Sequence, residues 1–384
     1  MTLKLLYTLI SFLTLALAAS VAQTDYEVMV IGGGPSGLSA LSGLSRVKRK
    51  TVLFDSGEYR NLPTRKMHDV IGNDGTVPSE FRSLVREQIS KYGTATFVDK
   101  KITAISPVID SSANTTYFNA TDADGEVYSA RKLVLATGLV DIIPDTPGLQ
   151  EAWGKGVYWC PWCDGYEHRD QPFGVLGPLA EVVASALEVY TLNQDIIAFL
   201  NGTHTPEAEA ELAAKYPDWK KRLEMYNVQL ENATISSFER IQDGEDNHDD
   251  EGREFDIFRV HFTNGSSVDR NAFITNYPTA QRSSIPSSLG LAMKGKSIDS
   301  NSAMRTSMSG VFAVGDCNGD GSTNVPHAMF SGKRAAVNAH VEMANEDSTA
   351  SISKRTLSRR AMEKEAERLM GSELEMLWHR ARGR

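Results

Sequence analysis

The stretch Tyr26-Glu27-Val28-Met29-Val30-Ile31-Gly32-Gly33-Gly34-Pro35-Ser36-Gly37 decides the fold. Its first half is a short apolar, β-branched run, which predicts a buried strand over 26–31. Its second half has the spacing Gly32-x-Gly34-x-x-Gly37, and helical spacing follows from Leu38 to Arg46. Glycines at this spacing permit a tight turn, let the backbone approach a pyrophosphate and let the helix pack closely on the strand. The stretch therefore predicts a dinucleotide site in which the helix start, with Pro35 and Ser36, receives the phosphates.

Two acidic residues extend this site. The next predicted strand, Thr51 to Phe54, ends in Asp55, which comes 18 residues after Gly37, where a carboxylate can accept hydrogen bonds from the adenosine ribose. The fingerprint alone serves FAD and NAD equally. The late pair Gly315-Asp316 closes another predicted strand, Gly310 to Val314, and flavoproteins use such an aspartate on the ribityl chain. We therefore expect FAD; the alternative is a tight packing turn without a ligand.

A cysteine pair, Cys160-Pro161-Trp162-Cys163, is followed directly by Asp164 and Gly165. This spacing at a helix start suits a reversible redox disulfide. A zinc site would need two further ligands, and His168 and Cys317 are the only nearby candidates, so we expect no metal; a purely structural disulfide stays open. The Asp164 carboxyl can protonate or deprotonate the thiol that leaves during exchange, unless it is a plain turn residue.

Length, charge and the N-terminus narrow the class of protein. At 384 residues the chain is too long for one ordinary core, and its net charge of −9 argues against a nucleic-acid binder. Lys4 precedes an apolar run over 5–19 and small residues around Ala22, which predicts a signal peptide over 1–22, cleaved near Ala22 or Ala18. A membrane anchor is the alternative, although the run is shorter than the roughly 20 residues of a span.

Glycosylation sequons agree with a secretory route. They begin at Asn114, Asn119, Asn201, Asn232 and Asn264, and none has proline in the middle. The chain has only three cysteines, so it is not a disulfide-framework protein. We expect a glycoprotein of the secretory pathway or the extracellular space.

The order of these motifs resembles that of the low-molecular-weight thioredoxin reductases. It runs from the glycine fingerprint through Ala136-Thr137-Gly138, Cys-x-x-Cys-Asp-Gly and a second dinucleotide-type unit to Gly-Val-Phe-Ala-x-Gly-Asp, over about residues 25–345. The resemblance implies FAD, with Thr137, Gly138, Gly315 and Asp316 beside it, and a homodimer. It also implies that Cys163 faces the flavin, that Cys160 exchanges with substrate, and that Asp164 transfers the proton.

The segment from Asp55 to Asn61, with Met67-His68 and Asp74-Gly75 downstream, is more similar to the fungal branch of that family. That branch includes dithiol oxidases of the gliotoxin type, which close disulfides in small metabolites and pass electrons to oxygen. Asn61 joins the expected cofactor-binding residues. The helix after Asn324 is expected to point its amino end towards the isoalloxazine, and His327 either adds to that charge or is a surface histidine.

One departure from the family concerns the second nucleotide loop, Val175-Leu176-Gly177-Pro178-Leu179-Ala180-Glu181-Val182. Leu179 replaces the glycine that a pyrophosphate needs, and Val182 replaces a small packing residue. The region that should hold arginines for a 2′-phosphate, Asn201 to His204, is followed by Glu207, Glu209 and Glu211. We therefore expect little or no NADPH binding.

The resulting expectation is an α/β protein with two Rossmann-like, doubly wound domains. The boundaries are a signal peptide over 1–22, an FAD domain over 23–141 and 269–346, an inserted NAD(P)-type domain over 142–268 and a basic helical tail over 347–384. The paired linkers should let the domains rotate.

Three functions compete at this point. The first is a secreted FAD-dependent dithiol oxidase, with a small dithiol and oxygen as partners. The second is an NADPH-dependent thioredoxin-disulfide reductase, whose partner is a thioredoxin-like protein. The third is a non-catalytic flavin-bound scaffold, against which the intact Cys-x-x-Cys-Asp argues.

Overall fold

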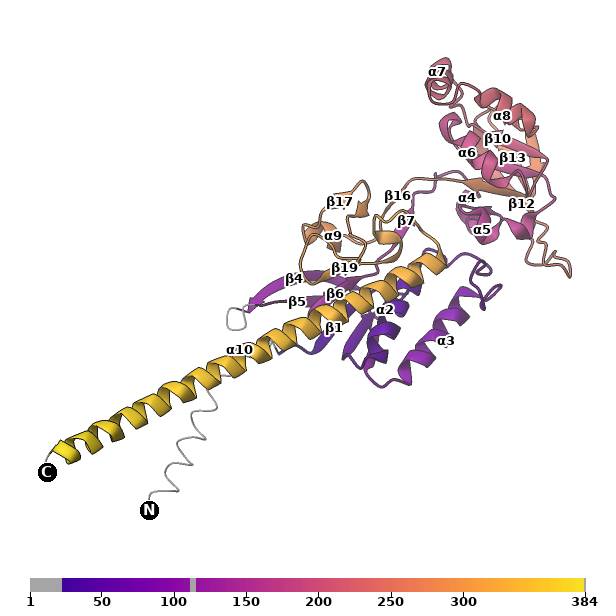
Figure 1. Ribbon diagram of the computed structural model, residues 1–384. Helices are drawn as coiled ribbons and strands as arrows, with labels where there is room; N and C mark the ends of the chain where they lie inside the picture. The colour runs from indigo at the N-terminus through magenta and orange to yellow at the C-terminus, as the bar shows by residue number, and fades with distance from the viewer. Residues whose placement is uncertain (1–22, 111–114, 383–384) are drawn as a thin grey trace.

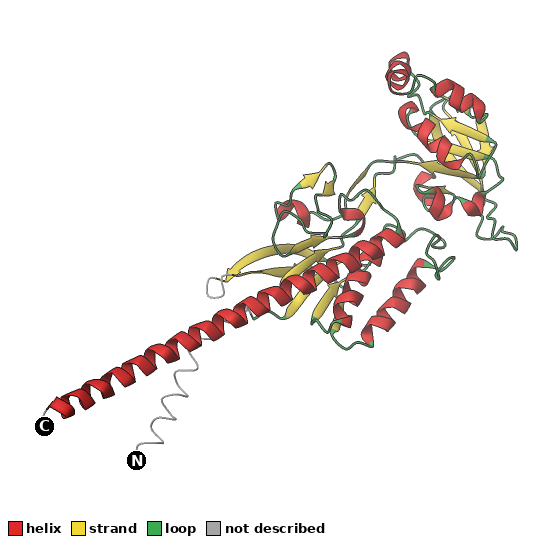
Figure 2. Ribbon diagram, viewed as in Figure 1, coloured by secondary structure: helices red, strands yellow, loops and turns green. Residues whose placement is uncertain are grey.

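A computed structural model describes residues 23–110 and 115–382. The expected signal peptide and the sequon at Asn114 lie outside the described residues. The fold is α/β, as predicted, with one Rossmann-like sheet in each of two lobes (Figures 1 and 2). No helix within the described ranges is both long and apolar enough to cross a membrane.

The first sheet has the order β3-β2-β1-β6-β5-β4, with β19 also pairing with β6. Its parallel strands are β1 (Tyr26–Ile31), β2 (Thr51–Phe54), β3 (Ala95–Val98), β6 (Val127–Leu135) and β19 (Val311–Ala313). β4 (Ile102–Asp110) and β5 (Thr115–Asp122) run antiparallel beside the first half of β6. The carboxyl ends of β1, β2 and β6 therefore meet at one edge, where the glycine loop begins.

Helices α2 (Pro35–Arg46) and α10 (Val325–Arg382) cover one face of this sheet, and α3 (Pro78–Ser90) lies beside them (Figure 1). The leucines of α2 recur every third residue and are fully buried with alanines of α10. A Cβ on Gly43 would lie 2.7 Å from that of Ala336, so this glycine lets the helices touch. The expected tail is no separate element, because α10 continues without a break past residue 347.

The second sheet has the order β11-β10-β9-β15-β8 and is parallel throughout. Its strands are β8 (Val157–Tyr158), β9 (Phe173–Leu176), β10 (Ile196–Phe199), β11 (Gln229–Glu231) and β15 (Ala272–Thr275). Helices α6 (Leu179–Val189), α7 (Pro206–Lys215) and α8 (Trp219–Met225) pack on it. Because β15 pairs with β9, the second domain extends to Thr275 and the boundary expected at 268 falls too early.

A three-stranded antiparallel sheet of β12 (Ile235–Gln242), β13 (Ile257–Phe262) and β14 (Ser267–Arg270) completes the second lobe. The short helices α4 (Leu149–Ala152) and α5 (Pro161–Asp164) and the 3-10 turn Tyr166–His168 lie on the side that faces the first lobe (Figure 1).

The lobes are joined by two strands, β7 (Leu139–Asp141) and β16 (Thr279–Gln281), which pair antiparallel as the two linkers. The first lobe is completed by α9 (Ile285–Ser288), the hairpin of β17 (Met293–Lys294) and β18 (Ser297–Ile298), and the 3-10 turn Gly315–Cys317.

Candidate active site

The glycine loop between β1 and α2 is shaped by two contacts that no larger residue would allow. A Cβ on Gly32, whose φ is 117°, would lie 2.2 Å from the carbonyl oxygen of Ala136, and one on Gly37 would lie 1.9 Å from the carbonyl oxygen of Gly32. A Cβ on Gly34 would meet nothing within 4 Å. Gly34 therefore faces open space at the amino end of α2, where backbone amides and the helix dipole favour a phosphate.

That space is part of a cleft of about 170 Å³ between the lobes. The cleft is lined by most of the residues expected from the sequence, namely Gly32, Gly34, Pro35, Ser36, Asp55, Asn61, Thr137, Gly138, Asp316, Cys163 and Asp164. The cleft runs from the glycine loop to the cysteine pair. It fits a dinucleotide such as FAD, whose pyrophosphate needs the bare backbone at Gly34.

Four expected residues do not line the cleft. Gly37 packs beneath Gly32, and Gly315, with a φ of 67°, packs beneath Ser36. The ring of His327 turns to Asp320, with 2.7 Å between its Nε2 and the carboxylate. Cys160 is the fourth expected site residue that does not line the cleft. Gly37 and Gly315 thus shape the backbone, and a role of His327 at the flavin stays a prediction.

Asp55 and Asp316 enter the cleft with partners of their own. Asp55 is buried and accepts hydrogen bonds from the Tyr59 hydroxyl, at 2.6 Å, and from the Gly57 amide, at 3.0 Å. Asp316 accepts one from Arg60 at 2.9 Å, although burial still raises its pKa. A carboxylate can accept about four hydrogen bonds, so both aspartates keep capacity for a ligand.

Cys160 and Cys163 form a disulfide at the start of α5. Cys163 lines the cleft, whereas Cys160 precedes the helix as its N-cap residue, next to Pro161. Trp162, in the same turn, is 68% exposed. The arrangement presents one sulfur to the cleft and leaves the other outside it.

Asp164 follows Cys163 in the same helical turn and lines the cleft with it. Burial raises its pKa to about 7, and the negative charges of Glu167 and Glu254 act in the same direction. A carboxyl that titrates near neutrality can both give and take a proton, which suits general acid–base chemistry beside a thiol.

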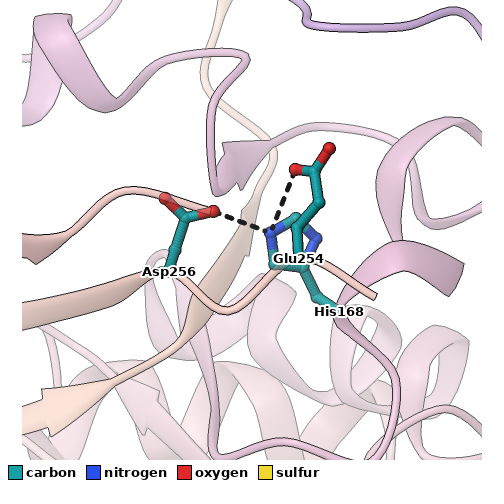
Figure 3. Close-up of side chains that lie close together, drawn as sticks. All are labelled: His168, Glu254 and Asp256. Atoms are coloured by element: carbon teal, nitrogen blue, oxygen red, sulfur yellow. Dashed lines mark hydrogen bonds and ion pairs between the residues drawn. The ribbon is translucent and has the colours of Figure 1, made fainter. Parts of the chain in front are cut away.

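His168, Glu254 and Asp256 meet behind this turn, with atoms within 4.8 Å of one another (Figure 3). They are the one metal-like group among the described residues. His168 lies 3.2 Å from Asp256, and burial would lower its pKa, but the bond to Asp256 raises it instead. Arg65 contacts both Asp256 oxygens, at 2.9 and 3.0 Å, and Arg240 contacts one of them as well. Guanidinium groups thus compensate the carboxylates, which makes the group an ion-pair network.

The second nucleotide loop is unfavourable to a phosphate for a different reason from the one that we expected from the sequence. The Leu179 side chain is fully buried among core residues such as Val183, so it does not project at a pyrophosphate, and the steric reason we expected is wrong. The Leu179 amide instead donates to the Thr203 hydroxyl at 3.3 Å. Pro178 has no N–H, and the Glu181 carboxylate reaches to 4.0 Å from where a Cβ on Gly177 would lie. The carboxylate of exposed Glu181 thus lies near the helix start at which a phosphate would bind.

Sequence reasoning missed the role of several residues that the fold brings to this region. Arg60 bridges Asp316 and Asp141, and its guanidinium lies 4.9 Å from the Trp159 ring. Arg65 and His68 come from the same segment, which the sequence marked only as a family-like motif. The carboxylates that Arg60, Arg65 and His68 contact in the second lobe or near β19 lie far along the chain. The sequence therefore offered only one sign of their role, namely several charged residues close together in this segment.

Comparison with known proteins gives a consistent result. The model of the family "Pyridine nucleotide-disulphide oxidoreductase" matches residues 26–332. A probable thioredoxin reductase of Arthroderma benhamiae is 52% identical and covers 92% of this chain and 91% of its own length. Thioredoxin reductase tcpT of Claviceps purpurea is 31% identical, over 83% of this chain and 94% of its own.

Solved structures agree with the fold. The crystal structure of HlmI superposes with a TM-score of 0.75 at 28% identity, over 88% of this chain and 97% of that one. An oxidoreductase from Agrobacterium tumefaciens has a TM-score of 0.70 at 26% identity, over 83% and 98%.

Proposed function

The chain belongs to the pyridine nucleotide-disulphide oxidoreductase family, in its fungal thioredoxin reductase-like branch, and from this premise we propose that it is an FAD-dependent dithiol oxidase that uses oxygen. The family is one of enzymes whose members typically bind FAD. The cleft fits that cofactor, because Gly34 leaves bare backbone at the start of α2 and Asp55 and Asp316 line the cavity. When bound, FAD accepts two electrons from the reduced cysteine pair and hands them to oxygen, which with two protons gives hydrogen peroxide.

The observation that carries the proposal is the contrast between the two nucleotide loops. The loop at α2 is open at Gly34, whereas at α6 the Leu179 amide is used by Thr203 and the Glu181 carboxylate covers Gly177. The basic side chains that follow the next strand do not offer a free phosphate site, because His204 and Lys220 are both paired with Glu209. Without a bound NADPH, the electrons must come from the dithiol.

The chain's own residues then divide the thiol chemistry. A substrate thiolate attacks Cys160 Sγ, the Cys160–Cys163 bond breaks, and Cys163 leaves as a thiolate towards the cleft. The second thiol of the substrate then attacks the substrate sulfur that is bonded to Cys160. This releases the Cys160 thiolate and closes the substrate disulfide. Asp164, with its pKa near 7, takes and returns the thiol proton beside Cys163.

An anaerobic titration distinguishes the oxidase from the NADPH-dependent reductase, which the names of the relatives favour. Purified protein is mixed with dithiothreitol or with NADPH, and the flavin absorbance is followed, with dithionite giving the fully reduced endpoint. Dithiothreitol should bleach the flavin, and air should restore it with one peroxide per flavin. Rapid stoichiometric bleaching by NADPH contradicts the proposal. Cys163→Ser is the control, because it removes the thiol route and leaves the NADPH route intact.

We also propose a secretory location and a homodimer. The location is supported by the N-terminal apolar run and the sequons, of which Asn264 lies exposed in the turn between β13 and β14. Enzymatic removal of N-glycans from protein secreted by its host should lower the mass, and Asn264→Gln should remove one glycan. Light scattering measures the oligomer; a monomer at micromolar concentration contradicts the dimer.

A further inference from the structure

Asp164 stands between two cavities. One is the cleft, and the other is a small, partly open space of about 10 Å³ behind the cysteine turn, also lined by His68 and Glu167. His68, like Asp164, lines both cavities. The small cavity offers about the room that one water needs, and it has several polar groups on its walls.

Glu167 makes this cavity more than a packing gap. Its Oε2 is buried and has no hydrogen-bond partner among the described residues, although an ionised carboxylate oxygen is costly to leave unpaired. Burial raises the pKa of Glu167, so its proton is easily held. Its other oxygen lies 3.5 Å from His68 Nδ1.

His68 connects the interior to solvent. Its Nδ1 also lies 3.5 Å from the carboxylate of Asp74, whose side chain is 69% exposed. The order Asp164, cavity, Glu167, His68 and Asp74 therefore runs from the redox turn to the surface through carboxyl and imidazole groups.

We propose that Glu167 and His68 form the proton relay of Asp164. The inference rests on the proposed function in one respect, namely that a thiol proton passes through Asp164. In each relay step one proton moves and no electrons do: Asp164 gives its proton through a cavity water to Glu167, Glu167 gives one to the imidazole of His68, and His68 gives one to solvent at Asp74.

The stoichiometry of dithiol oxidation requires such a route in both directions. Oxidising a dithiol frees two protons with two electrons, and forming hydrogen peroxide takes up two protons, so every proton that the reduced cofactor does not keep must leave the site in the first half of the cycle and return in the second. A cofactor seated in the cleft separates Asp164 from the solvent on that side, because Asp164 and the glycine loop line the same space. The cavity behind the turn leaves a path that the cofactor does not cover.

The charges that face the relay come from three elements. They are Arg65, Lys66 and His68 of the first lobe, Glu167 and His168 after α5, and Glu254 with Asp256 before β13. Arg65 and His168 are paired with Glu254 and Asp256. Of the remaining groups, Lys66, Glu167 and His68, the last two are in contact at 3.5 Å, and we assign the relay to them.

The test uses Glu167→Gln and His68→Gln, which keep size and lose the exchangeable proton, with Glu167→Asp as a conservative variant. Exposed Glu211→Gln in α7 is the matched control. Each protein, with equal flavin content and circular dichroism, is reduced anaerobically by dithiothreitol between pH 6 and 9 in a stopped-flow instrument, with and without added imidazole. Loss of a proton-transfer route should slow reduction by about tenfold or more.

A relay has a signature that a structural role lacks. Imidazole should restore the rate of both glutamine variants, Glu167→Asp should retain most of it, and the control should be unchanged. Wild-type rates and pH profile in Glu167→Gln, or a loss that imidazole does not restore, overturn the relay. If dithiothreitol fails to reduce even the wild-type flavin, the proposed function fails instead. The relay is then judged by iodoacetamide alkylation of the reduced cysteines, whose pH profile should still shift in Glu167→Gln; no shift refutes it.

Discussion

Replacing Asp164 by asparagine should make the protein more stable in alkaline solution, because the native site disfavours a charged carboxylate there. Burial raises the pKa of Asp164 from 3.8 to about 7. A folded-state pKa above the unfolded value means that the stability contribution is fully present below about pH 4 and is lost as the pH rises to 7. Asparagine carries no titrating group, so the variant should not show this loss.

The magnitude follows from the shift. About 3 pKa units at 1.36 kcal/mol each give roughly 4 kcal/mol between the acid and alkaline limits. Between pH 5 and pH 8.5 about two thirds of that change remains, and water in the cleft solvates part of the charge. The stability of Asp164→Asn relative to wild type should therefore rise by about 1–3 kcal/mol between these pH values.

Urea denaturation followed by tryptophan fluorescence measures this difference at pH 5 and 8.5, with equal flavin content in all samples. Asp246→Asn, in the exposed loop before β13, is the control and should behave like wild type. A relative stability that is the same at both pH values, or that falls at pH 8.5, would refute a raised pKa at Asp164. Asp164→Asn should also lose dithiol turnover. That result would show that the stability lost by ionising this buried carboxyl group is tolerated because the group is needed for the reaction.

Four further outcomes are expected. Cys160→Ser should leave a flavin-side thiolate and show long-wavelength charge-transfer absorbance, while Cys163→Ser should not; the reverse would exchange their roles. Gly34→Ala should fold normally, since its Cβ meets nothing within 4 Å. It should retain FAD about ten- to a hundredfold less tightly, because the added methyl group stands where the phosphate approaches the backbone amides; dialysis measures this. Arg65→Ala should lower the free energy of unfolding in urea by about 3 kcal/mol and speed proteolysis between the lobes. Arg259→Ala is the control: its pair with Asp269 is exposed, so the free energy of unfolding should change by less than about 1 kcal/mol. Truncation after residue 352 should keep flavin and turnover, because the ion pairs of Glu342, Glu346 and Asp347 with the first lobe remain; loss of flavin from the folded truncation would contradict this.

The parts of the site that sequence predicts are those set by neighbouring residues. The turn from β1 into α2 requires glycine at three fixed positions, and the disulfide requires two cysteines one helical turn apart, so both are visible locally. Leu179 shows the limit of this reasoning. Its position in the motif predicted a side chain aimed at a phosphate, but the side chain lies in the core, and only the fold decides which direction is buried.

Contacts between distant segments could not be predicted in the same way. Arg65 meets Asp256 across 191 positions, and Arg60 meets Asp316 across 256. The run before β13 is rich in acidic residues, a composition typical of a solvated loop, yet Asp256 from that run is fully buried. The paired charge in the first lobe makes that burial possible, and no local pattern reveals which cation will arrive.

The closed loop at α6 and the ion pairs of Arg65 bear on the same question, namely whether the lobes must rotate. A family member that takes electrons from NADPH has to turn its second domain so that the nucleotide can reach the flavin. In the oxidase that we propose, NADPH is not the electron donor, so this turn would not be needed to deliver electrons. Arg65, whose side chain is 8% exposed, joins the first lobe to three carboxylates of the second, so a rotation of the lobes would have to separate these ion pairs. We therefore expect the protein to work in the arrangement with Cys163 in the cleft, so that substrate reaches Cys160 from the outer side, past exposed Trp162.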